Sequence, residues 1–331
     1  MRSSRPLRPA VPRALVLSSL MTAALSVLTA SAPARAAADP DSCRQVLMAD
    51  PGWTDITATN AMAGVVLSAL GYEQKVSNLS VPITYVGLQK GQVDVFLGNW
   101  MPAQKNTVEP LVKDGRLAVL KTNLPGAKFT LAVPRHVAEA GVRSFQDLAR
   151  FAPKFDRRIY GIEPGSPANQ NIQRMLAARS YGLDGWTLVE SGEQGMLAQV
   201  ARKVAAKDWI VFLAWEPHQM NTRHELVYLD GDKDYFGPNY GAATVHTVAR
   251  KDYAAQCPNA ARLFSQMAFT VEMENQIITE VLEQRRDVRQ VAAAQLRAQP
   301  RLVEGWLAGV STRGGEDGLA AVRKALAQPQ P

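Results

Sequence analysis

Three tryptophans stand at positions where their rings could line a binding site. Trp100 and Trp215 come just after short apolar runs that are typical of strands, and Trp53 follows another such run by a short loop. In open α/β sheets, ligands bind in the crevice outside the carboxyl ends of the strands. An indole ring offers apolar contact and a face of negative potential that attracts cations. Each ring taken alone is more often part of the core, so position by itself leaves both interpretations open.

The other residues that carry chemistry form no catalytic or metal-binding motif. The sequence has no G-x-S-x-G nucleophile elbow, no H-E-x-x-H, no phosphate-binding P-loop and no dinucleotide-binding G-x-G-x-x-G. Its four histidines lack the spacing of metal ligands, and we expect each to be a surface or structural residue. They are His136, His218, His224 and His246. We therefore expect no enzyme activity, no metal and no cofactor.

Alternating strands and helices are predicted to position the tryptophans. The predicted strands are 46–48, 92–97, 128–133, 158–162, 186–189 and 208–214, with an extended stretch at 84–85. Gly71 should end a helix over 60–70, Ser144 should cap a helix through Leu148, and Ser191 with Gln194 forms a capping box for a helix through Val204. The last seventy residues are mainly helical. This alternation predicts an α/β fold.

The first residues have the layout of a secretory signal peptide. Four arginines precede an apolar run over 14–28, and small residues around Ala36 fit a cleavage site. The alternative is a membrane anchor, for which the run is short. We therefore predict that residues 1–36 form a signal peptide and that the rest of the chain is exported.

Removing that segment changes what the net charge implies. The 331 residues include 37 basic and 30 acidic side chains, a net charge of +7. Residues 1–36 hold five of the arginines and no acid, so 32 basic residues face 30 acidic ones in the remainder, a net charge of +2. A balance this close to neutral gives no support to nucleic-acid binding, and we expect no nucleic-acid partner.

Cys43 and Cys257 are the only two cysteines. An even pair in an exported protein suggests a disulfide, and the alternative is two buried free thiols.

Five segments of the chain are similar to motifs of one known family. They occur in the same order and with similar spacing, and the likeness covers nearly all of the chain beyond the signal peptide. The segments are 52–59 (GWTDITAT), 93–102 (VDVFLGNWMP), 160–165 (YGIEPG), 193–197 (EQGML) and 236–241 (FGPNYG). On these segments the chain resembles the choline-binding receptors of the glycine betaine/choline/carnitine importer family, which serve ABC-type importers.

The resemblance implies a type II periplasmic binding protein, an α/β fold of two lobes with a ligand cleft between them. One lobe is expected to combine residues 39–124 and 240–331, and the other to hold 125–239. The family's disulfide is implied at Cys43 and Cys257. The resemblance also implies a periplasmic location and a membrane permease as partner, and we expect the receptor to act as a monomer.

The family's ligand-binding residues can be carried over by position. They fall on Trp53, Asp55, Trp100, Phe129, Ser166 and Trp215. Two positions depart from the family, because Phe129 stands where its choline receptors have tyrosine and Ser166 where they have asparagine. Phenylalanine keeps the ring face but lacks the hydroxyl, and serine keeps a donor and an acceptor on a shorter arm.

Choline is the ligand that this set of side chains favours. A trimethylammonium group carries charge but no N–H, so aromatic faces suit it better than hydrogen-bond acceptors do. Asp55 would accept a hydrogen bond from the choline hydroxyl and would repel the carboxylate of betaine. The alternatives are a receptor for betaine, carnitine or acetylcholine, an exported enzyme acting on choline esters through Ser166, and a structural protein whose tryptophans belong to the core.

Overall fold

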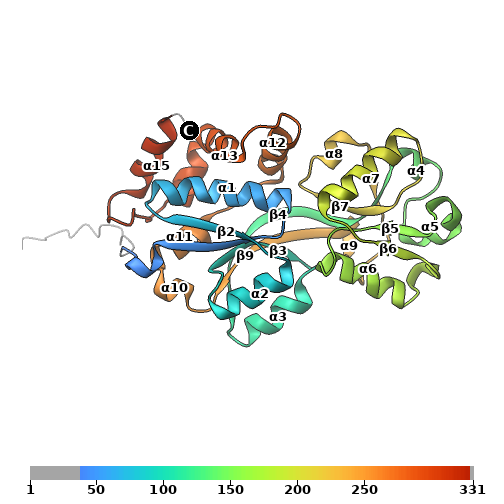
Figure 1. Cartoon of the computed structure of the whole chain (residues 1–331), viewed down its shortest axis with the longest axis horizontal. Helices are drawn as coiled ribbons and strands as arrows, with labels where there is room; N and C mark the ends of the chain where they lie inside the picture. Colours follow the sequence, from blue (N-terminus) through green and yellow to red (C-terminus); the bar gives the residue numbers. More distant parts are fainter. Residues whose placement is uncertain (1–37, 329–331) are drawn as a thin grey trace, which may run out of the picture. The chain divides into compact units, whose positions relative to one another are not determined.

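The chain folds around one mixed β-sheet with helices packed against it (Figure 1). The computed structural model describes residues 38–328, so the predicted signal peptide lies outside the described residues. Within that range nine strands run in the order β2-β1-β3-β9-β4-β7-β5-β6, with β8 paired to β4. The strands are β1 (Gln45–Asp50), β2 (Glu73–Asn78), β3 (Val95–Met101), β4 (Leu117–Pro134), β5 (Arg158–Tyr160), β6 (Thr187–Val189), β7 (Phe212–Glu216), β8 (Leu226–Tyr228) and β9 (Ala242–Arg250). The predicted α/β class is confirmed.

Helices connect most of these strands and make up most of the region after β9. The α-helices are α1 (Thr54–Ala69), α2 (Val81–Lys90), α3 (Lys105–Lys113), α4 (Arg135–Glu139), α5 (Phe145–Arg150), α6 (Pro167–Ala177), α7 (Glu193–Ala205), α8 (Met220–Arg223), α9 (Pro238–Gly241), α10 (Tyr253–Gln256), α11 (Pro258–Gln266), α12 (Val271–Leu282), α13 (Val288–Ala298), α14 (Pro300–Trp306) and α15 (Gly318–Ala327). Short 3-10 turns lie at Asp41–Cys43, Ala152–Phe155 and Ser180–Gly182. No helix within residues 38–328 is long and apolar enough to cross a membrane.

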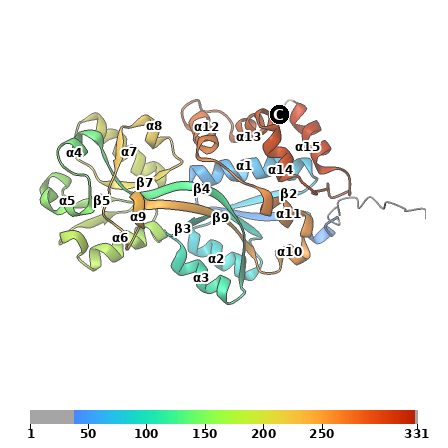
Figure 2. The same ribbon diagram turned by 180° about the vertical axis from the view of Figure 1, so that it is seen from behind.

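The long strands β4 and β9 link two groups of elements. Both run from the group around β1, β2 and β3 to the group around β5, β6 and β7, as the two opposite views show (Figures 1 and 2). Residues 117–128 of β4 pair with β9, and residues 128–132 pair with β7, in both cases antiparallel. One continuous strand therefore contributes side chains to both groups, and it carries Phe129 at the point where its partner changes.

Three local predictions were wrong. Residues 84 and 85 are not extended but lie in α2, which has a proline in its first turn and ends at Gly91 in the left-handed conformation. Helix α1 begins six residues before the predicted start at 60. Helix α7 begins at Glu193 with Gly192 as its N-cap and no side-chain cap, so the capping box is absent. By contrast, Ser144 does form a capping box on α5.

The predicted bridge between Cys43 and Cys257 is present. The two Cα atoms are 5.7 Å apart, within the range of natural disulfides. The bridge ties the turn before β1 to the start of α11 across 214 residues of sequence.

A thiol assay tests this bridge directly. Protein purified without reductant and then unfolded should show no free thiol, because these are the only two cysteines and both are oxidised. After reduction the same assay should find two thiols per chain. Two thiols without prior reduction would contradict the bridge.

Candidate functional site

Four aromatic side chains line a cavity beside strands β3, β4 and β7. The remaining lining comes from one carboxylate, one amide and four small or aliphatic residues. The lining residues are Trp53, Asp55, Trp100, Ala103, Gln104, Phe129, Ile162, Pro167, Ala168 and Trp215. Five of the six predicted ligand residues therefore meet in one place, and the tryptophans line a cavity as well as being buried.

The sheet brings three of these rings together. Phe129 on β4 and Trp215 on β7 are directly opposite each other in the antiparallel register, so both side chains leave the same face of the sheet. Trp100 is near the end of β3, and its ring centroid is 6.1 Å from that of Phe129. Gly241 makes room for this arrangement, because a Cβ atom there would meet the Phe129 carbonyl oxygen at 2.2 Å. A side chain at position 241 would therefore displace Phe129.

The beginning of α1 supplies the fourth ring and the carboxylate. Trp53 is the N-cap residue of α1, and Asp55 lies in its first turn. The preceding turn is held by Asp50, whose carboxylate accepts hydrogen bonds from the Gly52 N–H (2.7 Å) and the Thr57 hydroxyl (2.7 Å). Gly52 has φ +88°, a conformation that other residues rarely adopt. The turn between β1 and α1 thus directs Trp53 and Asp55 into the cavity.

Asp55 has one carboxylate oxygen without a partner. Its side chain is 1% exposed, and Oδ2 accepts a hydrogen bond from the Trp100 indole N–H at 3.1 Å. The other oxygen, Oδ1, is buried with no hydrogen-bond partner. Burial, with a contribution from the nearby Glu193 carboxylate, raises the pKa of Asp55 to about 8. A buried acceptor that lacks a donor is costly, so this oxygen is suited to a donor on a ligand.

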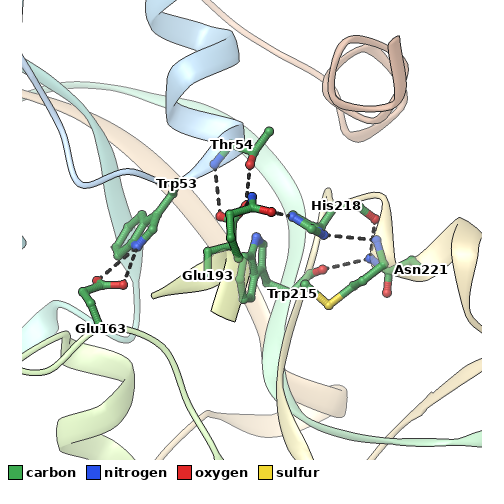
Figure 3. Close-up of polar contacts among 9 residues, drawn as sticks. Trp53, Thr54, Glu163, Glu193, Trp215, His218 and Asn221 are labelled. Carbon is green, nitrogen blue, oxygen red and sulfur yellow. Dashed lines mark hydrogen bonds and ion pairs between the residues drawn. The ribbon is translucent and has the colours of Figure 1, made fainter. Parts of the chain in front are cut away.

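Two further carboxylates lie around the start of α1 (Figure 3). Glu163 accepts a hydrogen bond from the Trp53 indole N–H at 3.1 Å, and burial raises the pKa of Glu163. Glu193, which is 3% exposed, accepts hydrogen bonds from the backbone N–H of Thr54 (3.1 Å) and from its hydroxyl. None of the described residues that line the cavity is basic. The surroundings of the cavity are therefore acidic and favour a cation.

Sequence reasoning from the residues did not single out Glu163, Glu193, His218 or Asn169 as parts of this region. Asn169 holds the turn after β5, since its amide bonds the backbone N–H and C=O of Ile162 at 3.0 and 2.8 Å. His218 is fully buried and packs its ring 5.0 Å from that of Trp215. Glu163 and Glu193 could have been found from the sequence, because they lie inside the family-like segments 160–165 and 193–197.

Ser166 is the predicted residue that the cavity does not include. It is the N-cap of α6, and its hydroxyl oxygen accepts a hydrogen bond from the Asn169 backbone N–H at 3.2 Å. The neighbouring Pro167 and Ala168 line the cavity instead. Within residues 38–328, no group of three or more His, Cys, Asp or Glu side chains is placed to hold a metal ion.

The fold and this cavity define a periplasmic binding protein, a class in which two lobes enclose a small solute. The comparison with protein families identifies which one. A family described as the substrate-binding domain of the ABC-type glycine betaine transport system matches residues 44–298, and the chain belongs to this family. Members of this family are the substrate-binding parts of transport systems.

Solved structures and curated proteins give more specific similarities. An ABC-transporter choline-binding protein in complex with choline is 49% identical, with a TM-score of 0.85 over 87% of this chain and the whole of that one. An ABC-transporter choline-binding protein in an unliganded semi-closed conformation is 48% identical, with a TM-score of 0.80 over the same shares. The glycine betaine/carnitine transport binding protein of Listeria monocytogenes is 29% identical over 48% of this chain and 52% of that protein.

Proposed function

We propose that this protein is the periplasmic receptor that captures choline in the aromatic cavity and delivers it to the membrane permease of an ABC importer. The observation that carries the proposal is a single unpartnered carboxylate oxygen in a cavity walled by four aromatic rings. The rings suit a trimethylammonium head, and the oxygen suits one hydroxyl.

The energetics of such a site are favourable for a quaternary ammonium ion. Water solvates the methylated head weakly, and each desolvated ring contributes ~0.5–2 kcal/mol of attraction. Four rings, together with the acidic surroundings, are sufficient for binding in the micromolar range, which corresponds to about −8 kcal/mol. The four rings are Trp53, Trp100, Phe129 and Trp215.

The polar groups of the cavity favour choline over betaine. Gln104 is the only amide of the lining, and one of its two N–H bonds donates to the Gly98 carbonyl oxygen at 2.8 Å. Among the described residues no basic side chain lines the cavity, so a ligand carboxylate would lie near the Asp55 carboxyl group without a cation to offset its charge. When Asp55 is ionised, such a like-charge contact is strongly unfavourable. The hydroxyl of choline instead supplies the donor that Oδ1 of Asp55 lacks.

The similarity to a choline complex at 49% identity supports the same ligand. The two departures from the family leave the cation-holding parts of the site in place. Phe129 keeps its ring against Trp100, and Ser166 serves to cap α6. The ester-hydrolysing alternative would need a serine next to a histidine, whereas the Ser166 hydroxyl oxygen accepts from the Asn169 backbone.

We also propose that the two lobes comprise residues 39–124 with 240–331, and residues 125–239. The change of partner along β4, from β9 to β7, supports a boundary near residue 125. In this arrangement Trp53, Asp55 and Trp100 belong to one lobe, and Phe129 and Trp215 to the other. The receptor acts as a monomer, and the segment 1–36 directs its export.

Equilibrium titration followed by tryptophan fluorescence tests the ligand. Choline should bind with a Kd in the micromolar range or below, because three of the lining residues are indoles and the hydroxyl has its acceptor. Acetylcholine should bind more weakly, since it lacks the hydroxyl, and betaine and carnitine should bind more weakly because of their carboxylates. Tighter binding of betaine than of choline would refute the proposed ligand, and hydrolysis of acetylcholine would indicate the enzyme.

A further inference from the structure

Glu193 makes a contact that the ligand site does not account for. It is the first residue of α7, yet its carboxylate bonds residue 54, which lies 139 positions earlier in the sequence. One oxygen accepts the Thr54 backbone N–H at 3.1 Å, and the other accepts the Thr54 hydroxyl. Figure 3 shows the Glu193 side chain between Thr54 and His218. Glu193 is not part of the cavity lining.

The contact gives a hydrogen-bond acceptor to a backbone N–H at the start of α1, which is buried. The first N–H groups of a helix have no partner within the helix, and the N-terminus attracts negative charge. Helix α1 has 16 residues, and its own N-cap residue, Trp53, provides no side-chain hydrogen bond. The Glu193 carboxylate supplies that cap from α7. A charged cap of this kind is a strong hydrogen bond, because a carboxylate accepts it in a buried place.

His218 fixes the Glu193 carboxylate from the other side. The Met220 backbone N–H donates to Nδ1 of His218 at 3.1 Å, so Nδ1 carries no proton. The proton of the neutral ring therefore lies on Nε2, which is 3.3 Å from Oε1 of Glu193 and donates to it. The same ring packs against Trp215, with the ring centroids 5.0 Å apart. A continuous path thus leads from the start of α1, through Glu193 and His218, to a wall of the cavity.

A second bond strengthens the same junction. The Trp53 indole N–H donates to Glu163, which follows β5, so both residues at the start of α1 are tied to the region over 163–193. The cavity is lined by Trp53 and Asp55 from the start of α1 and by Ile162 and Trp215 from the region over 158–216. Movement of the start of α1 away from that region would break the bonds of Thr54 and Trp53.

We propose that Glu193, held by His218, is the latch of the binding site: it binds the N-terminus of α1 to α7 and thereby sets how long a ligand stays, without touching the ligand. This inference rests on the proposed function for the ligand, but the latch itself is a property of the protein alone. Glu193 is a positioning residue in this scheme. Its removal should shorten residence for every quaternary ammonium ligand by the same factor.

Stopped-flow kinetics with choline and acetylcholine test the latch. Glu193→Gln replaces one acceptor oxygen by a donor and should raise the dissociation rate about tenfold for both ligands, the scale of one hydrogen bond to a charged group. Thr54→Val leaves Glu193 unchanged but removes the Thr54 hydroxyl, so it should also raise the dissociation rate. Thr54→Ser keeps a hydroxyl at this position and should keep most of the residence time of wild type. Glu225→Gln, at an exposed ion pair, is the matched control and should leave the dissociation rate unchanged.

Small-angle X-ray scattering of ligand-free protein separates the latch from the choice of ligand. Glu193→Gln should have a larger radius of gyration than wild type when ligand-free and the same radius when saturated with ligand. If wild type binds no choline, the proposed function fails, while the ligand-free comparison still tests the latch. The latch would be overturned if both Glu193→Gln and Thr54→Val left the dissociation rates and radii unchanged. It would also be overturned if either variant changed the ratio of choline to acetylcholine affinity.

Discussion

Trp100→Ala should weaken choline binding about hundredfold, a loss of ~3 kcal/mol. The indole is 4% exposed, stands next to Phe129, and donates its N–H to Asp55. Truncation therefore removes a cation-attracting face and also leaves a second oxygen of Asp55 without its donor. Because all quaternary ammonium ligands share the methylated head, betaine and carnitine should weaken by a similar factor. Isothermal titration calorimetry with each ligand measures these losses.

Two variants control for general damage. Trp100→Phe keeps a ring but loses the N–H, so it should lose much less affinity than Trp100→Ala. Trp209→Phe alters a tryptophan that packs on Phe151 and Phe155 away from the cavity, and it should bind choline as wild type does. A loss confined to choline after Trp100→Ala would argue against a shared cation site.

Asp55→Ala should weaken choline by ~1.5–3 kcal/mol, the scale of a hydrogen bond to a charged group. The reason is that Oδ1 of Asp55 is the unpartnered acceptor of the cavity. Betaine should lose less, or gain, because its carboxylate no longer meets a like charge. Asp55→Asn keeps the size of the side chain and one acceptor oxygen. Its affinity for choline should lie between those of wild type and Asp55→Ala. Equal losses for choline and betaine would mean that Asp55 does not recognise the hydroxyl.

The same residue should make choline affinity depend on pH. The Asp55 pKa is raised to about 8 by burial, so much of the ligand-free protein is protonated there at neutral pH. A bound cation favours the charged carboxylate, hence binding lowers the pKa and releases a proton. Affinity should then fall as pH drops below about 8, by at most tenfold per pH unit, and level off above it. Asp55→Asn should flatten this profile even though Asp50, Glu193 and Glu274 remain near position 55.

The site could be predicted in part because two of its rings, Trp100 and Trp215, lie near the carboxyl ends of β3 and β7. The sequence alone placed Trp100 and Trp215 after apolar strands, and the resemblance added Asp55 and Phe129. The sequence alone could not show whether these tryptophans line a cavity or belong to the core, because Trp100 and Trp215 are as buried as core residues. Ser166, which the resemblance assigned to the ligand site, caps α6 and is not among the residues that line the cavity, and a serine before Pro167 is well suited to an N-cap.

The parts of the structure that the sequence did not predict were missed for physical reasons. Helix α1 is buried on nearly all sides, so it lacks the alternation of polar and apolar faces that marks a surface helix, and its first turn was not predicted. The extended prediction at 84–85 followed local β propensity, whereas α2 is set by its first-turn proline and by Gly91. The bond between Thr54 and Glu193 joins positions far apart in the chain. No local pattern contains such a contact.

The place of β9 in the sheet has a consequence for the order of folding. This strand lies between β3 and β4, yet it begins at Ala242, more than 100 residues after β4 ends at Pro134. Until β9 is in place, the facing edges of β3 and β4 have no partner, so the centre of the sheet depends on contacts between residues far apart in the sequence. Contacts of this kind slow folding, because the long intervening chain must be ordered before they can form. We therefore expect the pairing of β9 with β3 and β4 to be a late step in the folding of this chain.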